Sequence, residues 1–492
     1  LSATTGQWTT LASWQRYSGT AWATPTAAQG YPGQYVGTGV VSILEGHTVT
    51  IGSGGITTQS FSRLSIAGTG QLYLTGASST VIFSLATNII DISSGGSIYF
   101  ANKARLTLNT NAAITLAIGP GSLTGSCNNN DEIYIGTAKY AVCAGAPGDI
   151  FTFAQLMSGG GTLNAIPSSN SPICQGSTIN LSGTYSGAIG TSPTYSWSVT
   201  APGGGVTVYP TQNPSITSAV TGTYLATLTV TTVLNGTTYT NAETISVVVN
   251  PLPTLSGATQ PVTICDGSPA AINLTGLIPS TTFSLNYTIN SVPQTQKTGL
   301  VASSGGTSSF TTPALSASNN GQTLQVTGIT ITSSSTNCSQ TFAQNVTLSV
   351  WTTGAGTWTG TTSSDWNTAS NWCGGSVPTA STDVFISPNS ASVLNQPVIG
   401  TAGGICKNIT INSGATVTIS ASNALEVKGN WTNNGTFTPN SGTVSFTGST
   451  AAQTIGGTGT NAFNNLTINN TYSGGGVKAA SNITVNGILN LE

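Results

Sequence analysis

The stretch Ile409-Thr-Ile-Asn-Ser-Gly-Ala-Thr-Val-Thr-Ile419 decides the fold. Its two apolar-Thr-apolar triplets, 409–411 and 417–419, place apolar side chains at every second position, and Asn-Ser-Gly marks a turn between them. Alternation with a period of two is typical of a strand with one buried face. The stretch therefore predicts two very short strands joined by a turn.

Similar triplets form two ladders along the chain. The first ladder consists of Val49-Thr-Ile51, Leu64-Ser-Ile66, Leu72-Tyr-Leu74, Val81-Ile-Phe83, Ile98-Tyr-Phe100, Leu106-Thr-Leu108 and Ile114-Thr-Leu116. The second adds Leu425-Glu-Val427, Val444-Ser-Phe446, Leu466-Thr-Ile468 and Ile483-Thr-Val485 to the two triplets above. Such short strands, at intervals of about 8 and about 17 to 22 residues, fit the coils of a right-handed parallel β-helix. We expect β-solenoids at residues 1–164 and 351–492, the second continuing beyond the chain end in a longer parent protein.

The composition agrees with an all-β protein. Helix formers are scarce, and Thr, Val, Ile and Asn dominate. Only 4% of the 492 residues are charged, against about 25% in ordinary soluble domains. Nine Lys and Arg against eleven Asp and Glu give a net charge of −2. This balance excludes a basic nucleic-acid footprint and polybasic attraction to membranes, and no apolar run is long enough for a membrane helix.

Two tryptophan-rich segments directly precede the ladders. Their tryptophans are Trp8, Trp14 and Trp22 in the first segment, and Trp358, Trp366 and Trp372 in the second. The first coil of a solenoid exposes an unpaired edge and an open core, so an aromatic segment that covers that end is expected. We interpret all six as cap aromatics; the alternative is that they stack on sugars.

Residues 165–350 have longer strands, with turn signals at the spacing typical of β-sandwiches. Tyr195-Ser-Trp197-Ser-Val199 predicts a strand with a buried Trp, and 222–230 predicts a later strand. Asn250-Pro-Leu-Pro253 marks a boundary, because proline cannot donate to a ladder. We expect one immunoglobulin-like sandwich at 165–250 and a second at 251–350.

These segments resemble known repeat families. The 195–199 and 222–230 strands are similar to PKD-like and other immunoglobulin-like repeats, although the Gly-Asp-Gly turn of PKD repeats is missing. The openings Ile173-Cys-Gln-Gly176 and Ile264-Cys-Asp-Gly267, and the second Trp segment, resemble repeats of very large surface proteins of Bacteroidota, including gliding adhesins exported by type IX secretion. The resemblance implies a scaffold at the cell surface and carries over no catalytic residue.

The seven cysteines lack the Cys-x-x-Cys spacing of zinc sites, and in an exported chain they predict disulfides. Sorting them by the expected domains predicts three pairs: Cys127–Cys143, Cys265–Cys338 and Cys373–Cys406. Cys174 is left over, and we expect a reduced, buried thiol there rather than an intermolecular bridge.

Candidate chemistry is sparse. His47 is the only histidine, and no Gly-x-Ser-x-Gly motif adjoins it, so we interpret it as a turn residue rather than a general base. The best oxygen-rich loop is 128–132, where Asp131 and Glu132 are a calcium candidate; we favour the alternative, a polar loop closed by the Cys127–Cys143 disulfide without a metal. We expect no catalytic residue, no cofactor and no enzyme activity.

The leading hypothesis is therefore a non-enzymatic extracellular adhesin or filament segment of a Gram-negative bacterium, which mediates attachment, including attachment during gliding, through a stiff multidomain stalk. Its expected partners are surface polysaccharides, abiotic surfaces, other surface proteins or further domains of the same chain, and not nucleic acid or the membrane interior. The alternatives are a carbohydrate-binding or polysaccharide-degrading β-helix protein, and a self-assembling extracellular fibre subunit.

Overall fold

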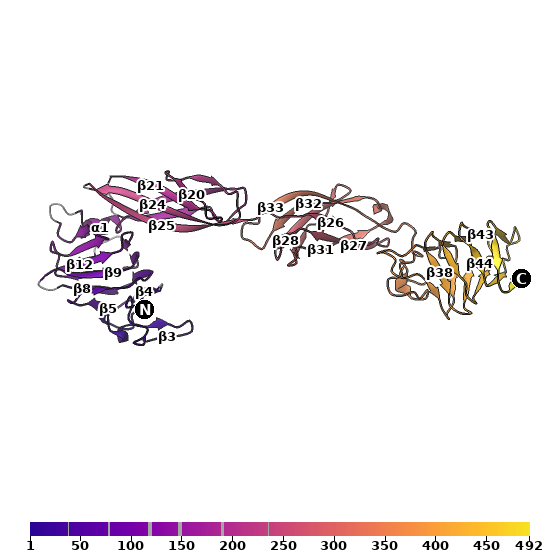
Figure 1. Ribbon diagram of the computed structural model, residues 1–492, viewed down its shortest axis with the longest axis horizontal. Helices are drawn as coiled ribbons and strands as arrows, with labels where there is room; N and C mark the ends of the chain where they lie inside the picture. Colours follow the sequence, from indigo (N-terminus) through magenta and orange to yellow (C-terminus); the bar gives the residue numbers. More distant parts are fainter. Residues whose placement is uncertain (38, 77–78, 117–120, 146–149, 188–190, 235) are drawn as a thin grey trace. The chain divides into compact units, whose positions relative to one another are not determined.

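The computed structural model describes residues 1–37, 39–76, 79–116, 121–145, 150–187, 191–234 and 236–492 (Figure 1). The chain divides into two compact units, Leu1–Pro251 and Leu252–Glu492. Their boundary lies within the predicted Asn250-Pro-Leu-Pro253 segment. Each unit combines one β-solenoid with one pair of facing sheets, so the predicted all-β class and the solenoid arrangement are confirmed.

The first solenoid stacks short parallel strands into three sheets, in the orders β1-β5-β8-β11-β14, β13-β10-β7-β4 and β17-β16-β15-β12-β9-β6. Its strands are β1 Gly6–Gln7, β4 Val40–Ile43, β5 Thr48–Ile51, β6 Ile56–Thr57, β7 Arg63–Ile66, β8 Gln71–Thr75, β9 Val81–Leu85, β10 Ile89–Ile92, β11 Ser97–Ala101, β12 Ala104–Leu108, β13 Ala113–Leu116, β14 Leu123–Gly125, β15 Glu132–Ile135, β16 Ala138–Val142 and β17 Phe151–Thr152. A separate hairpin, β2 Arg16–Tyr17 and β3 Trp22–Ala23, precedes them.

Each coil contributes three strands, one to each sheet. Val49, Leu72, Ile98 and Leu123 stack in register along one sheet, and all are buried. Because neighbouring residues point the opposite way, the intervening Thr and Tyr side chains lie on the outer face. The period-two alternation of the sequence therefore creates one continuous interior core.

At the far end of this solenoid, one strand reverses direction and a short helix follows. β16 pairs with β15 antiparallel, and β17 then pairs with β16 in parallel. Helix α1 (Phe153–Gly159) begins at a capping box, in which Thr152 and Gln155 bond each other's backbone, and ends at Gly160 in the left-handed conformation. Its Phe153 and Leu156 are buried in the solenoid core. In Figure 1, α1 and β3 lie at opposite ends of the stack formed by β5, β8, β9 and β12.

Residues 164–250 form two facing sheets, ordered β18-β20-β23 and β19-β25-β24-β21-β22. The strands are β18 Asn164–Ser169, β19 Ile173–Cys174, β20 Thr178–Ser186, β21 Thr191–Thr200, β22 Val206–Tyr209, β23 Ser215–Thr217, β24 Gly222–Leu234 and β25 Thr237–Asn250. Trp197 is fully buried in their core, as expected. Tyr239 contacts the solenoid: its hydroxyl donates to the Lys139 carbonyl at 3.2 Å, and its ring packs edge-on against Tyr140.

Residues 257–347 form a second pair of sheets, ordered β26-β27-β31 and β29-β28-β32-β33, with β30 also paired to β28. The strands are β26 Gly257–Thr259, β27 Ser268–Thr275, β28 Thr282–Ile289, β29 Val292–Pro293, β30 Lys297–Val301, β31 Ser308–Leu315, β32 Thr323–Ile331 and β33 Ser339–Thr347, with the 3-10 turn η2 Ala317–Asn319. Phe283, Leu285, Tyr287 and Phe310 pack at the centre of this core.

The second solenoid has the same three-strand coils, in sheets β34-β37-β40-β43-β46, β35-β38-β41, β36-β39-β42-β45-β48 and β44-β47. Its strands are β34 Val384–Ile386, β35 Val398–Ile399, β36 Gly404–Cys406, β37 Ile409–Ile411, β38 Thr416–Ile419, β39 Ala424–Val427, β40 Trp431–Asn433, β41 Thr436–Thr438, β42 Thr443–Phe446, β43 Gln453–Gly456, β44 Asn461–Phe463, β45 Asn465–Ile468, β46 Val477–Ala479, β47 Ile483–Val485 and β48 Leu489–Leu491. The deciding stretch, 409–419, supplies β37 and β38.

Candidate functional site

The second cap is a cluster of three buried tryptophans. Trp358, Trp366 and Trp372 are at most 2% exposed. The Trp372 ring packs edge-on against both others, with centroids 4.8 Å apart in each pair. The Trp372 indole nitrogen donates to the Trp366 carbonyl at 2.8 Å, and the 3-10 turn η3 (Ala369–Asn371) joins the two residues. All three residues are therefore cap aromatics, as predicted.

The first cap repeats this arrangement with two tryptophans. Trp8 and Trp14 are each 1% exposed, and their rings pack edge-on at 5.1 Å. The Trp14 indole nitrogen donates to the Trp8 carbonyl at 2.7 Å, and the 3-10 turn η1 (Leu11–Ser13) joins them. Trp8 and Trp14 thus correspond in structure to Trp366 and Trp372.

The backbone places Ser2 where the second cap has Trp358. The Ser2 amide donates to Ser42 in β4, as the Trp358 amide donates to Phe385 in β34. The tryptophans of the two segments therefore do not correspond in order along the chain, because Trp8 matches Trp366 rather than Trp358. Trp22 has no counterpart in the second cap. Trp22 is 48% exposed, so its prediction as a cap aromatic was wrong.

Trp22 instead lines an open groove beside the first cap. The groove has a volume of about 650 Å³, and Trp14, Val41 and Phe61 are among its buried lining residues. Trp22 and Tyr17 lie directly opposite each other in the β2–β3 hairpin, with ring centroids 5.1 Å apart. Tyr17 is 51% exposed. The hairpin therefore holds two rings together at the edge of the groove.

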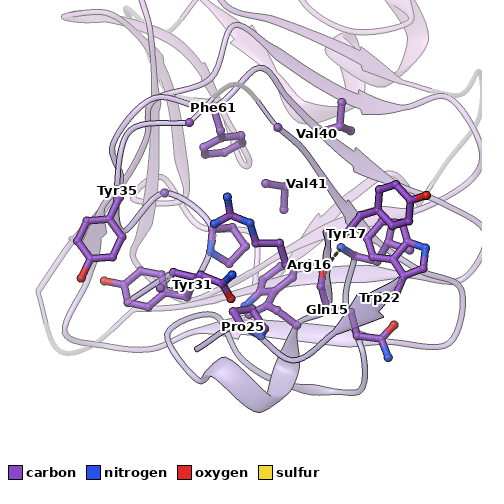
Figure 2. Close-up of a pocket in the computed structure, with 18 of the residues that line it drawn as sticks. Gln15, Arg16, Tyr17, Trp22, Pro25, Tyr31, Tyr35, Val40, Val41 and Phe61 are labelled. Atoms are coloured by element: carbon purple, nitrogen blue, oxygen red, sulfur yellow. Dashed lines mark hydrogen bonds between the residues drawn. The ribbon is translucent and has the colours of Figure 1, made fainter. Parts of the chain in front are cut away.

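Tyr31 and Tyr35 line the other side of the groove (Figure 2). Their loop is anchored twice: the Trp8 indole nitrogen donates to the Pro32 carbonyl at 2.9 Å, and the Gln59 amide donates to the Gly33 carbonyl at 2.6 Å. Gly33 has a positive φ, and a Cβ there would lie 2.4 Å from the Thr58 Cβ. The cap and the first coil together fix this aromatic loop.

Arg16 supplies the charge of the groove. It is the only Lys, Arg, Asp or Glu among the described lining residues, and it is exposed. Figure 2 shows its side chain between the Tyr31 side and the Trp22 side. The described side chains of the groove therefore combine exposed aromatic rings with one guanidinium.

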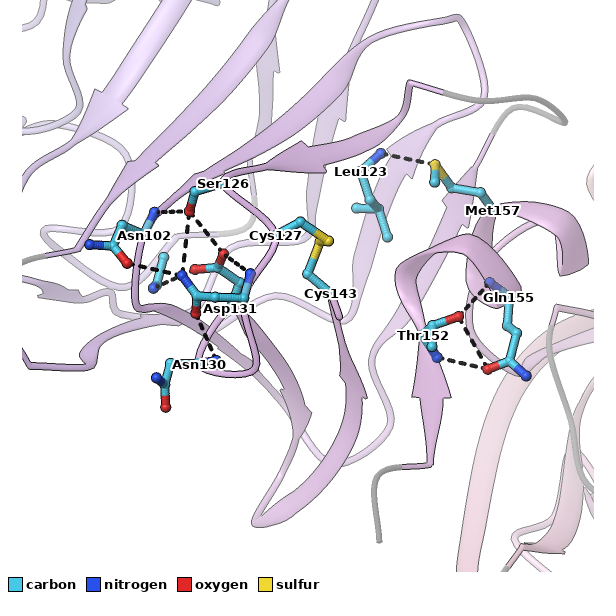
Figure 3. Close-up of a disulfide and its surroundings, with 12 residues drawn as sticks. Asn102, Leu123, Ser126, Cys127, Asn130, Asp131, Cys143, Thr152, Gln155 and Met157 are labelled. Carbon is cyan, nitrogen blue, oxygen red and sulfur yellow. Dashed lines mark hydrogen bonds between the residues drawn. A yellow bond between two sulfur atoms is a disulfide. The ribbon is translucent and has the colours of Figure 1, made fainter. Parts of the chain in front are cut away.

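The cysteines pair differently from the prediction. Cys127–Cys143 forms as expected (Figure 3). Cys265, however, bonds Cys373, which directly follows Trp372 of the second cap. Near this bond, the Thr263 amide donates to the hydroxyl of Ser392, between β34 and β35, at 2.6 Å. The predicted pairs Cys265–Cys338 and Cys373–Cys406 were therefore wrong.

The remaining cysteines also depart from expectation. Cys406 is a free thiol, because the alternation of β36 points its side chain into the solenoid core. Cys338 is disulfide-bonded, and so is Cys174, which was predicted to be reduced. Six disulfide-bonded cysteines mark an oxidising compartment, so the protein is extracellular or periplasmic. Within the described ranges, no helix combines the length and apolar character needed to cross a bilayer.

The two calcium candidates, Asp131 and Glu132, bond hydrogen-bond donors and cationic side chains of the protein. The Asp131 carboxylate is fully buried and accepts hydrogen bonds from the Ala104 amide at 3.2 Å, and from the Ser126 hydroxyl and the Asn128 amide at 3.1 Å each. Glu132 pairs with Arg105 at 2.8 Å and with Lys139 at 3.0 Å. Such donors compete with a cation for these oxygens, so the described geometry is that of a structural loop (Figure 3).

His47 has a structural contact. Its Nδ1 lies 2.9 Å from the Ser2 hydroxyl, which also accepts from the Leu44 amide at 2.8 Å. This contact joins the N-terminal segment to the turn before β5.

Comparisons with known proteins find a match to one family model and similarity to solved structures. A family model described as a domain of unknown function (DUF8693) matches residues 357–480, which begin at the second cap and include most of the second solenoid. The chain is also similar to fibronectin(III)-like modules of Clostridium thermocellum CbhA, at 15% identity and a TM-score of 0.20, over 38% of this chain and 95% of that one. Among curated proteins, no match is found.

Proposed function

We propose that this chain is a non-enzymatic adhesion segment of an extracellular protein, and that it attaches through the aromatic groove of its first unit. The observation that carries the proposal is the pair of rings on the β2–β3 hairpin, Tyr17 and Trp22, each about half exposed beside a groove of about 650 Å³. Large aromatic side chains lose favourable burial when they face water, so a fixed, exposed group of them favours a contact surface.

The side chains that line the groove support attachment rather than catalysis. General acid-base catalysis requires titratable groups held near one another with adjusted pKa values. Among the described lining residues, Arg16 has no carboxylate, histidine or lysine beside it within the groove. Among the described side chains that line the groove, aromatic faces and one guanidinium can hold a ligand, and none is a general base near neutral pH.

Two side chains support the immunoglobulin-like interpretation of residues 165–250. Trp197 is buried in β21 between the two sheets. The Tyr224 hydroxyl, near the start of β24, donates back to the Val220 carbonyl at 3.0 Å. A buried Trp and a tyrosine that bonds upstream backbone are both hallmarks of immunoglobulin-like domains. We also propose that the chain is part of a cell-surface adhesin of the Bacteroidota type that its sequence resembles.

Adhesion of coated beads tests the proposal. Beads carrying the wild-type chain should attach to polysaccharide-coated surfaces, and Trp22→Ala together with Tyr35→Ala should reduce attachment at least tenfold. Tyr472→Ala, which removes an exposed ring in the second unit, is the matched control and should leave attachment unchanged. Equal attachment by all three proteins would overturn the assignment of the groove, and turnover of any polysaccharide would overturn the non-enzymatic proposal.

A further inference from the structure

Arg16 differs from the other two arginines of the chain. Arg63 pairs with Asp91 at 2.9 Å, and Arg105 pairs with Glu132 at 2.8 Å. Within the described ranges, Arg16 has no carboxylate at ion-pair distance and its guanidinium makes no hydrogen bond. In a chain with so few charges, the one arginine without a carboxylate partner lies in the aromatic groove.

The groove has the shape and polarity for one class of ligand. A volume of about 650 Å³ is within the usual range for ligand sites. Aromatic faces on two sides suit flat ligands with apolar C–H faces, and pyranose rings present such faces while their hydroxyl groups point outward. Gln15 and Gln29 also line the groove, and their amides can bond hydroxyl groups.

The charge of the groove selects among glycans. A guanidinium presents a planar fork of donors that matches a carboxylate with two parallel hydrogen bonds. No carboxylate among the described lining residues would repel an acidic ligand. A neutral glycan would leave the Arg16 charge partly desolvated without a counter-charge, which is unfavourable.

We propose that the groove binds an acidic polysaccharide of hexuronate units, with a uronate carboxylate on Arg16 and adjacent pyranose faces on the Tyr17–Trp22 and Tyr31–Tyr35 sides. This inference rests on the proposed adhesive function and names the ligand class of the same site. Binding is non-covalent, and attachment of a long polymer gains strength from the many chains displayed on one surface.

Calorimetric titration with defined oligosaccharides tests the ligand class. The probes are hexamers of galacturonate and of mannuronate, the same hexamers with methyl-esterified carboxyl groups, and a neutral glucose hexamer. The wild-type chain should bind at least one of the two free-acid hexamers ten or more times tighter than its methyl ester. Raising salt from 50 to 500 mM should weaken that binding, because the contact is an ion pair.

Variants separate the charge from the rings. Arg16→Gln should remove the preference for the free acid, and Arg16→Lys should restore only part of it, because a lysine keeps the charge without the fork. Trp22→Ala should weaken the binding of every hexamer that the wild-type chain binds. Lys478→Gln removes an exposed charge from the second unit and should change nothing. Thermal melting of each variant at the wild-type temperature verifies that it is folded.

The outcomes distinguish this inference from the proposed function. Equal binding of free-acid, esterified and neutral hexamers, or an acid preference that survives Arg16→Gln, would overturn the hexuronate assignment. Failure of both free-acid hexamers to bind would overturn it as well. If bead attachment still depends on Trp22 in those cases, the adhesive function stands and only the ligand class is wrong.

Discussion

Cys406 is a fully buried thiol at the end of β36. Burial raises its pKa, and the nearby Asp383 and Glu426 raise it further. Since the thiolate is the reactive form, the Cys406 thiol should be inert at pH 8, where an exposed cysteine with a pKa of about 8.5 is partly ionised. We predict that iodoacetamide labels no cysteine in the native chain and one, Cys406, after unfolding without reductant.

Mass spectrometry of the labelled peptides checks this outcome. Labelling of the native chain would show that β36 opens, and two or more labelled cysteines after unfolding would contradict the disulfide assignment.

The alternation Gly404-Ile-Cys406 indicates a core position for Cys406. This local pattern was a better guide to the state of Cys406 than the pairing of cysteines by expected domain. Nothing local to Cys265 indicates its bond to Cys373, because that pairing depends on how the second cap meets the preceding sheets.

The two caps are elements in which buried and exposed tryptophans can be compared directly. Replacing Trp366 with Ala removes a fully buried ring that packs against Trp372. Its loss should lower the free energy of unfolding by about 3 to 5 kcal/mol. Trp22→Ala removes a half-exposed ring and should lower it by less than about 1 kcal/mol. Chemical denaturation followed by circular dichroism measures both; similar losses would contradict the different roles assigned to these tryptophans.

At the scale of elements, the ladders could be predicted because each coil records its own buried face in period-two alternation. Ile409, Ile411, Val417 and Ile419 are all fully buried. The groove could not be predicted in the same way, since its rings come from a hairpin and a loop without periodicity. One signal was available: the spacing from Trp8 to Trp14 equals that from Trp366 to Trp372, which leaves Trp22 outside the cap.

At the scale of the whole chain, disulfide mapping tests the assignment of the units. Digestion without reduction should yield one peptide pair containing Cys265 and Cys373, and another containing Cys127 and Cys143. Cys174 and Cys338 should each appear in a bridged peptide. Recovery of Cys373 linked to Cys406 would contradict both the buried thiol and the attachment of the second cap to the preceding sheets.

The Cys265–Cys373 bond also limits how far the second unit can be stretched. When the chain ends are pulled, the bond holds the Cys265 and Cys373 backbones together, so the segment between them cannot be drawn out to its full length. These 108 residues of separation, at about 3.4 Å each when extended, represent roughly 370 Å of hidden length. This length is therefore unavailable to extension under force until the disulfide is reduced.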